Sequence, residues 1–175
     1  MKSRLLILSD LWGIRKSDWV GFYLKLLEAE FDVCYYDCCE LGDVNTSEYC
    51  ESALHSQFVD GGIDAAVEKL LEKETDGVDV LAFSIGGTIA WKAALKGLKV
   101  TNFYAVSATR LRCESQKPVC VIKLFYGEKD KFKPTHDWFE SMEIPFEVMH
   151  GADHLMYSER SCSEIICNDI LNARK

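Results

Sequence analysis

The chain has 175 residues, of which 48% are hydrophobic and 27% charged, and its formal net charge is −8. These values are typical of one globular domain spanning residues 1–175, and they exclude an intrinsically disordered chain. The acidic balance argues against a nucleic acid or an anionic membrane surface as a partner.

The N-terminus carries no predicted targeting segment. Its apolar run covers only residues 5–8 before Ser9 and Asp10, which is too short for the hydrophobic region of a signal peptide. No segment approaches the length of a membrane span. The eight cysteines therefore predict reduced thiols and a cytoplasmic location rather than a disulfide framework. Their spacing lacks the Cys-x-x-Cys pairs of zinc sites, so we expect no bound metal.

Short apolar runs and segments of helical period alternate along the chain. The apolar runs, which predict strands, are residues 4–8, 31–36, 78–83, 101–106, 119–126 and 145–149. The helical segments between or after them are residues 18–30, 63–74, 85–96 and 158–173. Near-continuous hydrophobicity is typical of strands that are buried on both faces of a parallel sheet. The alternation predicts a doubly wound α/β sheet of about six mostly parallel strands, with helices on both faces.

The connection between the fourth and fifth predicted strands is short. Residues 107–118 are rich in polar and charged side chains and show no helical stripe. This leaves little room for a lid domain, or even for a full crossover helix. We therefore expect an open site without a lid.

The segment most informative about chemistry surrounds Ser84. An apolar strand ends at Phe83, Ser84 follows at a sharp turn, and a helix begins at once. A nucleophile on such a turn projects its hydroxyl above the sheet edge, and the residues two positions before and after it must be small. Ala82 and Gly86 meet that demand. The turn also places the backbone amide of Ile85 where it points at a developing negative charge, as the first donor of an oxyanion hole.

This pattern resembles the nucleophile elbow of the α/β-hydrolase superfamily, usually written Gly-x-Ser-x-Gly, with Ala82 in place of the first glycine. The resemblance covers nearly the whole chain and begins at the strand that the family counts as its third. It implies a compact α/β-hydrolase fold without a lid, and a triad in the chain order serine, acid, histidine. The alternative for Ser84 is a buried serine on an ordinary strand-to-helix turn.

The resemblance also implies an acid and a base. Asp130 stands in a Gly-x-x-Asp turn after the fifth strand and is the expected acid, with Glu128 and Asp137 as alternatives. His154 stands in the loop after the last strand and is the expected base. His150 is the competing base, but it lies at the strand end, where a side chain points along the sheet. The structural alternative for Asp130 is a solvated turn carboxylate.

The loop after the first strand is the expected source of the second oxyanion donor. The family often has His-Gly where this chain has Ser9 and Asp10. A backbone amide does the work, so the donor is expected to be Leu11, with Trp12 as the alternative. The Trp12 side chain is expected either to wall the acyl pocket or to be a core or rim aromatic.

Two arginines follow the fourth strand at the same edge of the sheet. Arg110 or Arg112 is expected either to clamp a substrate carboxylate or phosphate by bidentate hydrogen bonds, or to belong to a charged surface loop.

Together these residues predict a serine hydrolase that cleaves a small-molecule carboxylester or thioester through an acyl-enzyme on Ser84, without a metal or organic cofactor. One alternative is a catalytically inert α/β-hydrolase relative that binds a partner or ligand. Another is a flavodoxin-like binding module, but residues 9–13 lack the glycine-rich or hydroxyl-rich character of a phosphate loop. The sequence leaves the substrate and the oligomeric state open.

Overall fold

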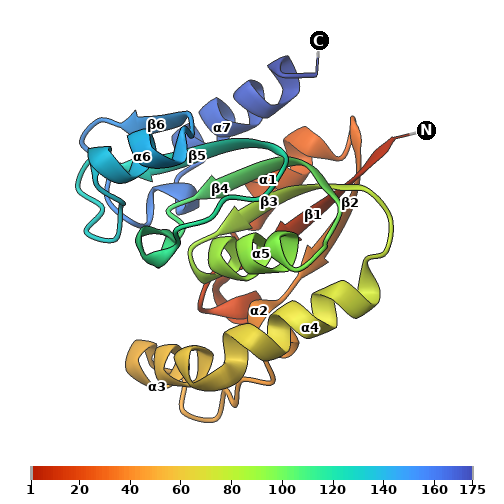
Figure 1. The fold of residues 1–175 in the computed structure, drawn as a ribbon, viewed down its shortest axis with the longest axis vertical. Helices are drawn as coiled ribbons and strands as arrows, with labels where there is room; N and C mark the ends of the chain where they lie inside the picture. Colours follow the sequence, from red (N-terminus) through yellow and green to blue (C-terminus); the bar gives the residue numbers. More distant parts are fainter. Residues whose placement is uncertain (1, 175) are drawn as a thin grey trace.

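The computed structural model describes residues 2–174 and contains a parallel sheet between two layers of helices (Figure 1). Within these residues the sheet has six strands in the order β2-β1-β3-β4-β5-β6, and all neighbouring strands are parallel. The strands are β1 (Ser3–Leu8), β2 (Phe31–Tyr36), β3 (Val78–Phe83), β4 (Val100–Val106), β5 (Val121–Gly127) and β6 (Phe146–Met149). The fold class predicted from the sequence is confirmed.

Helices cover both faces of the sheet. They are α1 (Val20–Leu27), α2 (Cys38–Leu41), α3 (Glu51–Gln57), α4 (Ile63–Lys73), α5 (Ile85–Leu95), α6 (His136–Met142) and α7 (Arg160–Asn172). Helices α1 and α7 pack on one face, and α4 and α5 pack side by side on the other (Figure 1). The described part of the chain contains no helix that is long and apolar enough to cross a membrane.

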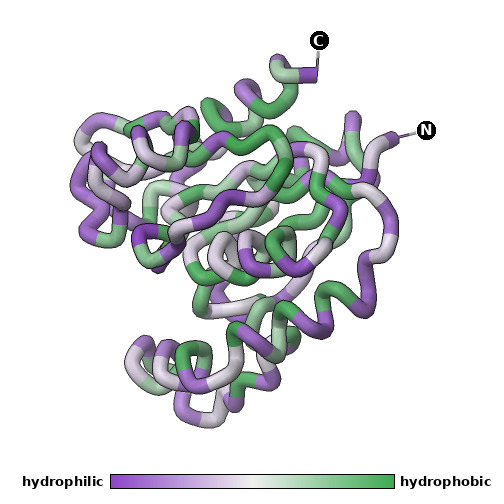
Figure 2. The backbone as a smooth tube through the Cα atoms, viewed as in Figure 1, coloured by the Kyte–Doolittle hydropathy of each residue, from purple (hydrophilic) through white to green (hydrophobic). Residues whose placement is uncertain are grey.

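Strand β1 illustrates why a continuous apolar run folds into the middle of such a sheet. Leu6 and Leu8 point into the core beneath α4 and α5, whereas Leu5 and Ile7 point into the core beneath α1 and α7. All four side chains are fully buried. Each burial stabilises the fold by about 1.5–3 kcal/mol relative to an exposed side chain. Hydrophilic residues gather in the peripheral loops instead, as Figure 2 shows.

Two connections shape the edge of the sheet at the carboxyl ends of the strands. The link from β4 to β5 contains only the short 3-10 helix η3 (Leu111–Cys113) within the described residues, as its polar sequence predicts. The link from β2 to α4 is longer and contains α2 and α3, neither of which the sequence analysis assigned. Leu54 and Phe58 anchor α3 to the core, since both are fully buried.

Candidate active site

The predicted site residues lie at the carboxyl ends of the strands, where the strand order reverses. The chain runs from β1 outward to β2 and then returns to β3 on the other side of β1. The loops that follow β1 and β3 therefore diverge, and a crevice forms between them. Leu11 follows β1, Ser84 follows β3, and both line this crevice.

Ser84 occupies a strained turn between β3 and α5. Its φ of 50° and ψ of −117° lie in a region that non-glycine residues rarely adopt. The Ser84 amide donates to the Val106 carbonyl at 3.0 Å, which ties the turn to β4. A Cβ atom on Gly86 would overlap the Ser9 carbonyl and touch Leu8, so the helix approaches β1 too closely for any larger residue. The small residue that the sequence pattern requires at this position thus has a steric cause.

The structure brings Ser84, His154 and Asp130 together in one chain of contacts. Ser84 Oγ lies 3.2 Å from His154 Nε2, and His154 Nδ1 lies 2.9 Å from Asp130 Oδ2. The Asp130 side chain is fully buried, and its second oxygen accepts the Phe132 amide at 2.8 Å. This arrangement allows the imidazole to take the hydroxyl proton while the carboxylate fixes the ring orientation.

The alternative acids and base are engaged elsewhere. Glu128 accepts the Gly151 amide at 2.8 Å and lies 2.9 Å from His150 Nδ1. The His150 side chain is 94% exposed, so it points away from the crevice. Asp137 is exposed on α6. The geometry therefore favours Asp130 and His154 over all three alternatives.

Two residues of the cleft lining have backbone amides without a hydrogen-bond partner in the described part of the chain. Leu11 and Ile85 both line the cleft, and among residues 2–174 no hydrogen bond uses the amide of either. The Trp12 amide, by contrast, donates to Asp10 Oδ1 at 2.9 Å. Of the two donors considered for the first loop, Leu11 is thus the available one.

Asp10 is a buried carboxylate that the sequence analysis passed over. Its second oxygen accepts a hydrogen bond from the Tyr157 hydroxyl at 3.0 Å, so Asp10 joins the loop after β1 to the segment that follows His154. Burial raises the pKa of Asp10 to about 6, although the Trp12 amide and the Tyr157 hydroxyl oppose that rise. The sequence holds no specific signal for its burial, because a place two residues after β1 does not show which side chains pack around it.

The raised pKa of Asp10 predicts a specific pH dependence of stability. The folded state binds this proton more tightly than the unfolded state does, so stability should fall as pH rises between about 4 and 6. Asp10→Asn removes the ionisation and keeps one acceptor for Trp12. We expect the free energy of unfolding of the wild type, relative to that variant, to drop by about 2 kcal/mol between pH 4 and pH 7. Urea unfolding at several pH values measures this difference.

Glu74→Gln provides a control of opposite sign. Burial alone would raise the pKa of Glu74, but hydrogen bonds from Arg4 and Tyr36 outweigh it and leave the pKa lowered. The stabilisation from ionised Glu74 is present above the unfolded pKa and is lost as pH falls. Parallel pH trends for the Asp10 and Glu74 variants would contradict the role assigned to Asp10.

The cleft around Ser84 has a volume of about 960 Å³. Apolar side chains that line it come from Leu11, Trp12, Phe132 and Leu155. Arg110 and Arg112 lie in the same lining, so the structure brings Trp12 and Arg110 to the cleft with the three residues of the hydrogen-bonded chain.

Helix α3 forms a wall of the cleft for which the sequence analysis gave no expectation. Glu51, Ser52 and His55 contribute to the lining, and all three are exposed. His55 is thus a surface residue on the side of α3 that faces the cleft. The helix has seven residues, too few for a clear apolar stripe, so periodicity offered no signal for it.

Comparisons with known proteins yielded matches in structure but not in sequence. No protein-family model matches the chain, and no curated protein matches its sequence. A Xanthomonas campestris protein assigned to the alpha/beta superfamily of hydrolases superposes with a TM-score of 0.72 at 12% identity, over 98% of this chain and 99% of that one. A carboxylesterase of Nitrososphaera gargenis matches with a TM-score of 0.67 at 15% identity, over 97% of this chain and 90% of that one.

The carboxylesterase CesB of Bacillus subtilis is a further match, with a TM-score of 0.63 at 14% identity, over 97% of this chain and 82% of that one. Such identities are low, but the matched regions span at least 97% of this chain and at least 82% of each of the three matched chains. The strand order, the strained serine turn and these superpositions lead to one conclusion: the chain has the α/β-hydrolase fold.

Proposed function

We propose that this protein is a serine hydrolase that cleaves a carboxylester or thioester through an acyl-enzyme on Ser84. The observation that carries the proposal is the continuous contact from Ser84 Oγ through His154 to the buried carboxylate of Asp130. The likeness in fold to carboxylesterases supports the same reaction class.

The mechanism follows from these positions. His154 takes the proton of Ser84 as its oxygen attacks the substrate carbonyl, and Asp130 holds the ring and stabilises its positive charge. The Ile85 and Leu11 amides donate to the tetrahedral oxyanion. The intermediate collapses when His154 gives its proton to the departing alcohol or thiol. Water then attacks the acyl-enzyme, passes a proton to His154, and the acid leaves as Ser84 regains its hydrogen.

A fluorophosphonate probe tests this proposal directly. Ser84 Oγ should displace fluoride from phosphorus, so the folded protein should gain one phosphonyl group, which peptide mass spectrometry should locate on Ser84. Ser84→Ala should remove the label. Ser52→Ala, which alters a second serine in the cleft lining, should keep it.

A screen of short-chain p-nitrophenyl esters and acyl thioesters then separates the two substrate types. Hydrolysis should disappear in the Ser84→Ala protein. Folded protein that takes no label and hydrolyses none of the esters would instead support the inert, ligand-binding alternative.

A further inference from the structure

The charge of the cleft is opposite to that of the protein. The chain carries a net charge of −8, yet four cationic side chains line the cleft within the described residues, against two acidic ones outside the hydrogen-bonded chain of Ser84, His154 and Asp130. The cationic side chains belong to Arg110, Arg112, Lys129 and Lys131, and the acidic ones to Glu51 and Asp153. An acidic protein with a basic cleft favours an anionic ligand in that cleft.

Arg110 is held next to the nucleophile. The amide of Thr109, its neighbour in the chain, donates to the Ser84 carbonyl at 3.2 Å. The Thr88 hydroxyl, from α5, donates to the Thr109 carbonyl. Arg110 itself has a φ of 62°, a left-handed conformation that costs a non-glycine residue about 1 kcal/mol. The backbone thus carries strain at the point where Arg110 enters the cleft.

The Arg110 guanidinium has no acidic partner within residues 2–174, and the residue is half-buried. Arg112 is more exposed, lies 5.8 Å from the Phe132 ring centre and donates to the Phe132 carbonyl at 3.4 Å. A half-buried guanidinium without an acidic partner gains most from a carboxylate or phosphate, which it binds through two parallel hydrogen bonds.

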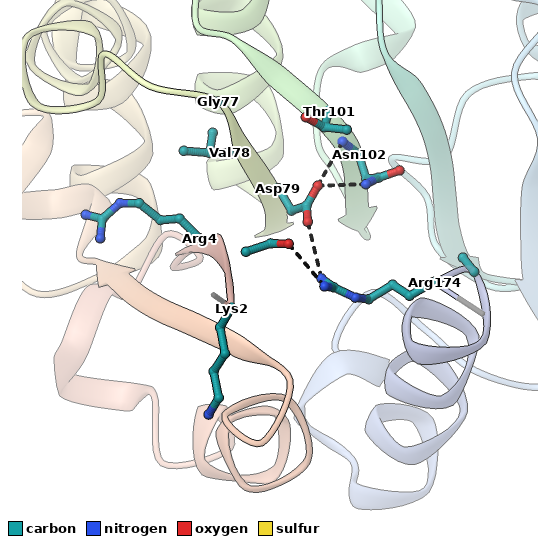
Figure 3. Close-up of a pocket in the computed structure, with 10 residues that line it drawn as sticks. Lys2, Arg4, Gly77, Val78, Asp79, Thr101, Asn102 and Arg174 are labelled. Atoms are coloured by element: carbon teal, nitrogen blue, oxygen red, sulfur yellow. Dashed lines mark hydrogen bonds and ion pairs between the residues drawn. The ribbon is translucent and has the colours of Figure 1, made fainter.

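A pocket at the opposite end of the sheet gives a contrast, because both of its arginines have acidic partners. Figure 3 shows the pair that Arg174 forms with Asp79. Arg174 lies 3.7 Å from Asp79, which also accepts from Asn102. Arg4 pairs with Glu74 at 2.8 Å. These cations have structural partners, whereas Arg110 in the cleft does not.

We infer that the substrate carries an anionic group, a carboxylate or a phosphate, which Arg110 binds while the scissile carbonyl lies at Ser84. The inference rests on the proposed function and names its substrate class. The apolar side chains of Phe132 and Leu155 contact the rest of the substrate in the same cleft. Lys129 and Lys131 raise the encounter rate with an anion, and salt screens this effect.

The test compares pairs of esters in which one member carries a carboxylate and the other a neutral group at the same position. The rate of uncatalysed hydrolysis of each ester corrects for differences in intrinsic reactivity. In the acyl arm, the p-nitrophenyl monoester of adipic acid is compared with p-nitrophenyl hexanoate. In the leaving-group arm, the hexanoate ester of 4-hydroxybenzoate is compared with that of methyl 4-hydroxybenzoate. The wild type should prefer the charged member in one arm, and that arm identifies which part of the substrate carries the anion. We expect a kcat/KM ratio of about tenfold or more.

Arg110→Gln should reduce this ratio by about 10- to 100-fold, and Arg110→Lys should restore part of it. The ratio cancels any general loss of activity. Arg160→Gln is the matched control, because Arg160 is an exposed arginine on α7 that does not line the cleft, and the ratio should stay unchanged. Equal rates for both members of each pair, or a ratio that Arg110→Gln leaves intact, would overturn the inference.

Binding to the Ser84→Ala protein provides a readout that does not depend on turnover. Monomethyl adipate or the hexanoate of 4-hydroxybenzoate should bind more tightly than its neutral counterpart in calorimetric titrations, and adding Arg110→Gln should abolish the difference. A charge preference in binding without any hydrolysis by the wild type retains the anionic ligand and refutes the hydrolase. Hydrolysis without a charge preference in either measurement refutes the anionic ligand and retains the hydrolase.

Discussion

Ser84→Ala should lower kcat for ester hydrolysis by about 10⁶-fold, and His154→Ala should lower it by a similar factor. Ser84 Oγ and His154 Nε2 lie 3.2 Å apart, so the proton transfer between them is one event that neither group performs alone. The double variant should therefore be no slower than either single variant. Single-turnover and steady-state rates of all three proteins with a p-nitrophenyl ester measure this non-additivity.

Asp130→Asn should cost less, about 10⁴-fold, because the serine and imidazole remain in place. An amide at this position favours the tautomer with a proton on Nε2, which cannot accept the Ser84 proton, and it no longer stabilises the imidazolium. Retention of more than a hundredth of the wild-type rate in Ser84→Ala would remove this residue from its role. A double variant more than tenfold slower than both single variants would show that the two groups act separately.

Gly127→Ala is expected to damage the site through its backbone. Gly127 ends β5, and a Cβ atom there would overlap the Asp153 carbonyl and lie 2.6 Å from the Ala152 carbonyl oxygen, both in the loop that leads to His154. The methyl group must push that loop away from the turn that holds Asp130. Displacement of catalytic groups by about 1 Å typically costs about 10²-fold in rate. We expect a loss in kcat of at least that size, and about 1–3 kcal/mol of lost stability.

Gly21→Ala is the control for this prediction. Gly21 lies in α1, and no atom stands within 4 Å of the position that a Cβ would occupy. Alanine favours a helix by about 1 kcal/mol over glycine, so this variant should be slightly more stable and fully active. Denaturant midpoints measure the stability of the two glycine variants, and kcat values measure their activity. An active Gly127→Ala protein would mean that the loop adapts without moving His154.

The strands could be predicted from the sequence because a strand that is buried on both faces appears as a continuous run of apolar residues. The predicted run at 78–83 coincides with β3, whose residues are all buried. The predicted start at 119 is two residues early, since β5 begins at Val121 and the apolar Val119 before it is fully exposed and pairs with no strand. Apolar character alone does not distinguish a strand residue from an exposed one beside it.

The short helices could not be predicted, since their stability depends on capping and tertiary packing rather than on periodicity. Helix α2 has four residues, and the Asp37 carboxylate caps it by accepting the Cys39 amide at 2.7 Å. In α6, the Thr135 hydroxyl accepts the Trp138 amide at 3.3 Å. These caps are visible in the sequence only after the helix is known.

Much of the candidate site was predictable, because the order of strands fixes which loops share an edge. Ser84, Asp130 and His154 each follow a strand, and parallel strands bring the segments after their carboxyl ends together. The orphan charge of Arg110 and the burial of Asp10 were not predictable. The first depends on the lack of an acidic side chain near Arg110, and the second on the side chains that cover Asp10. Only the folded structure shows which side chains are neighbours.

Strand β6 is short and lies at the edge of the sheet, which limits the local stability of the loop that carries His154. Its four residues form the end strand of the sheet, next to β5, and the histidine loop follows it. Short border strands fray at a lower free energy than the centre of a fold. We expect such fraying to displace the loop that carries His154, whereas the Ser84 amide stays bonded to the Val106 carbonyl of β4. Mild heat or denaturant should therefore abolish the proposed ester hydrolysis reversibly, at conditions where most backbone amide protons are still protected from exchange.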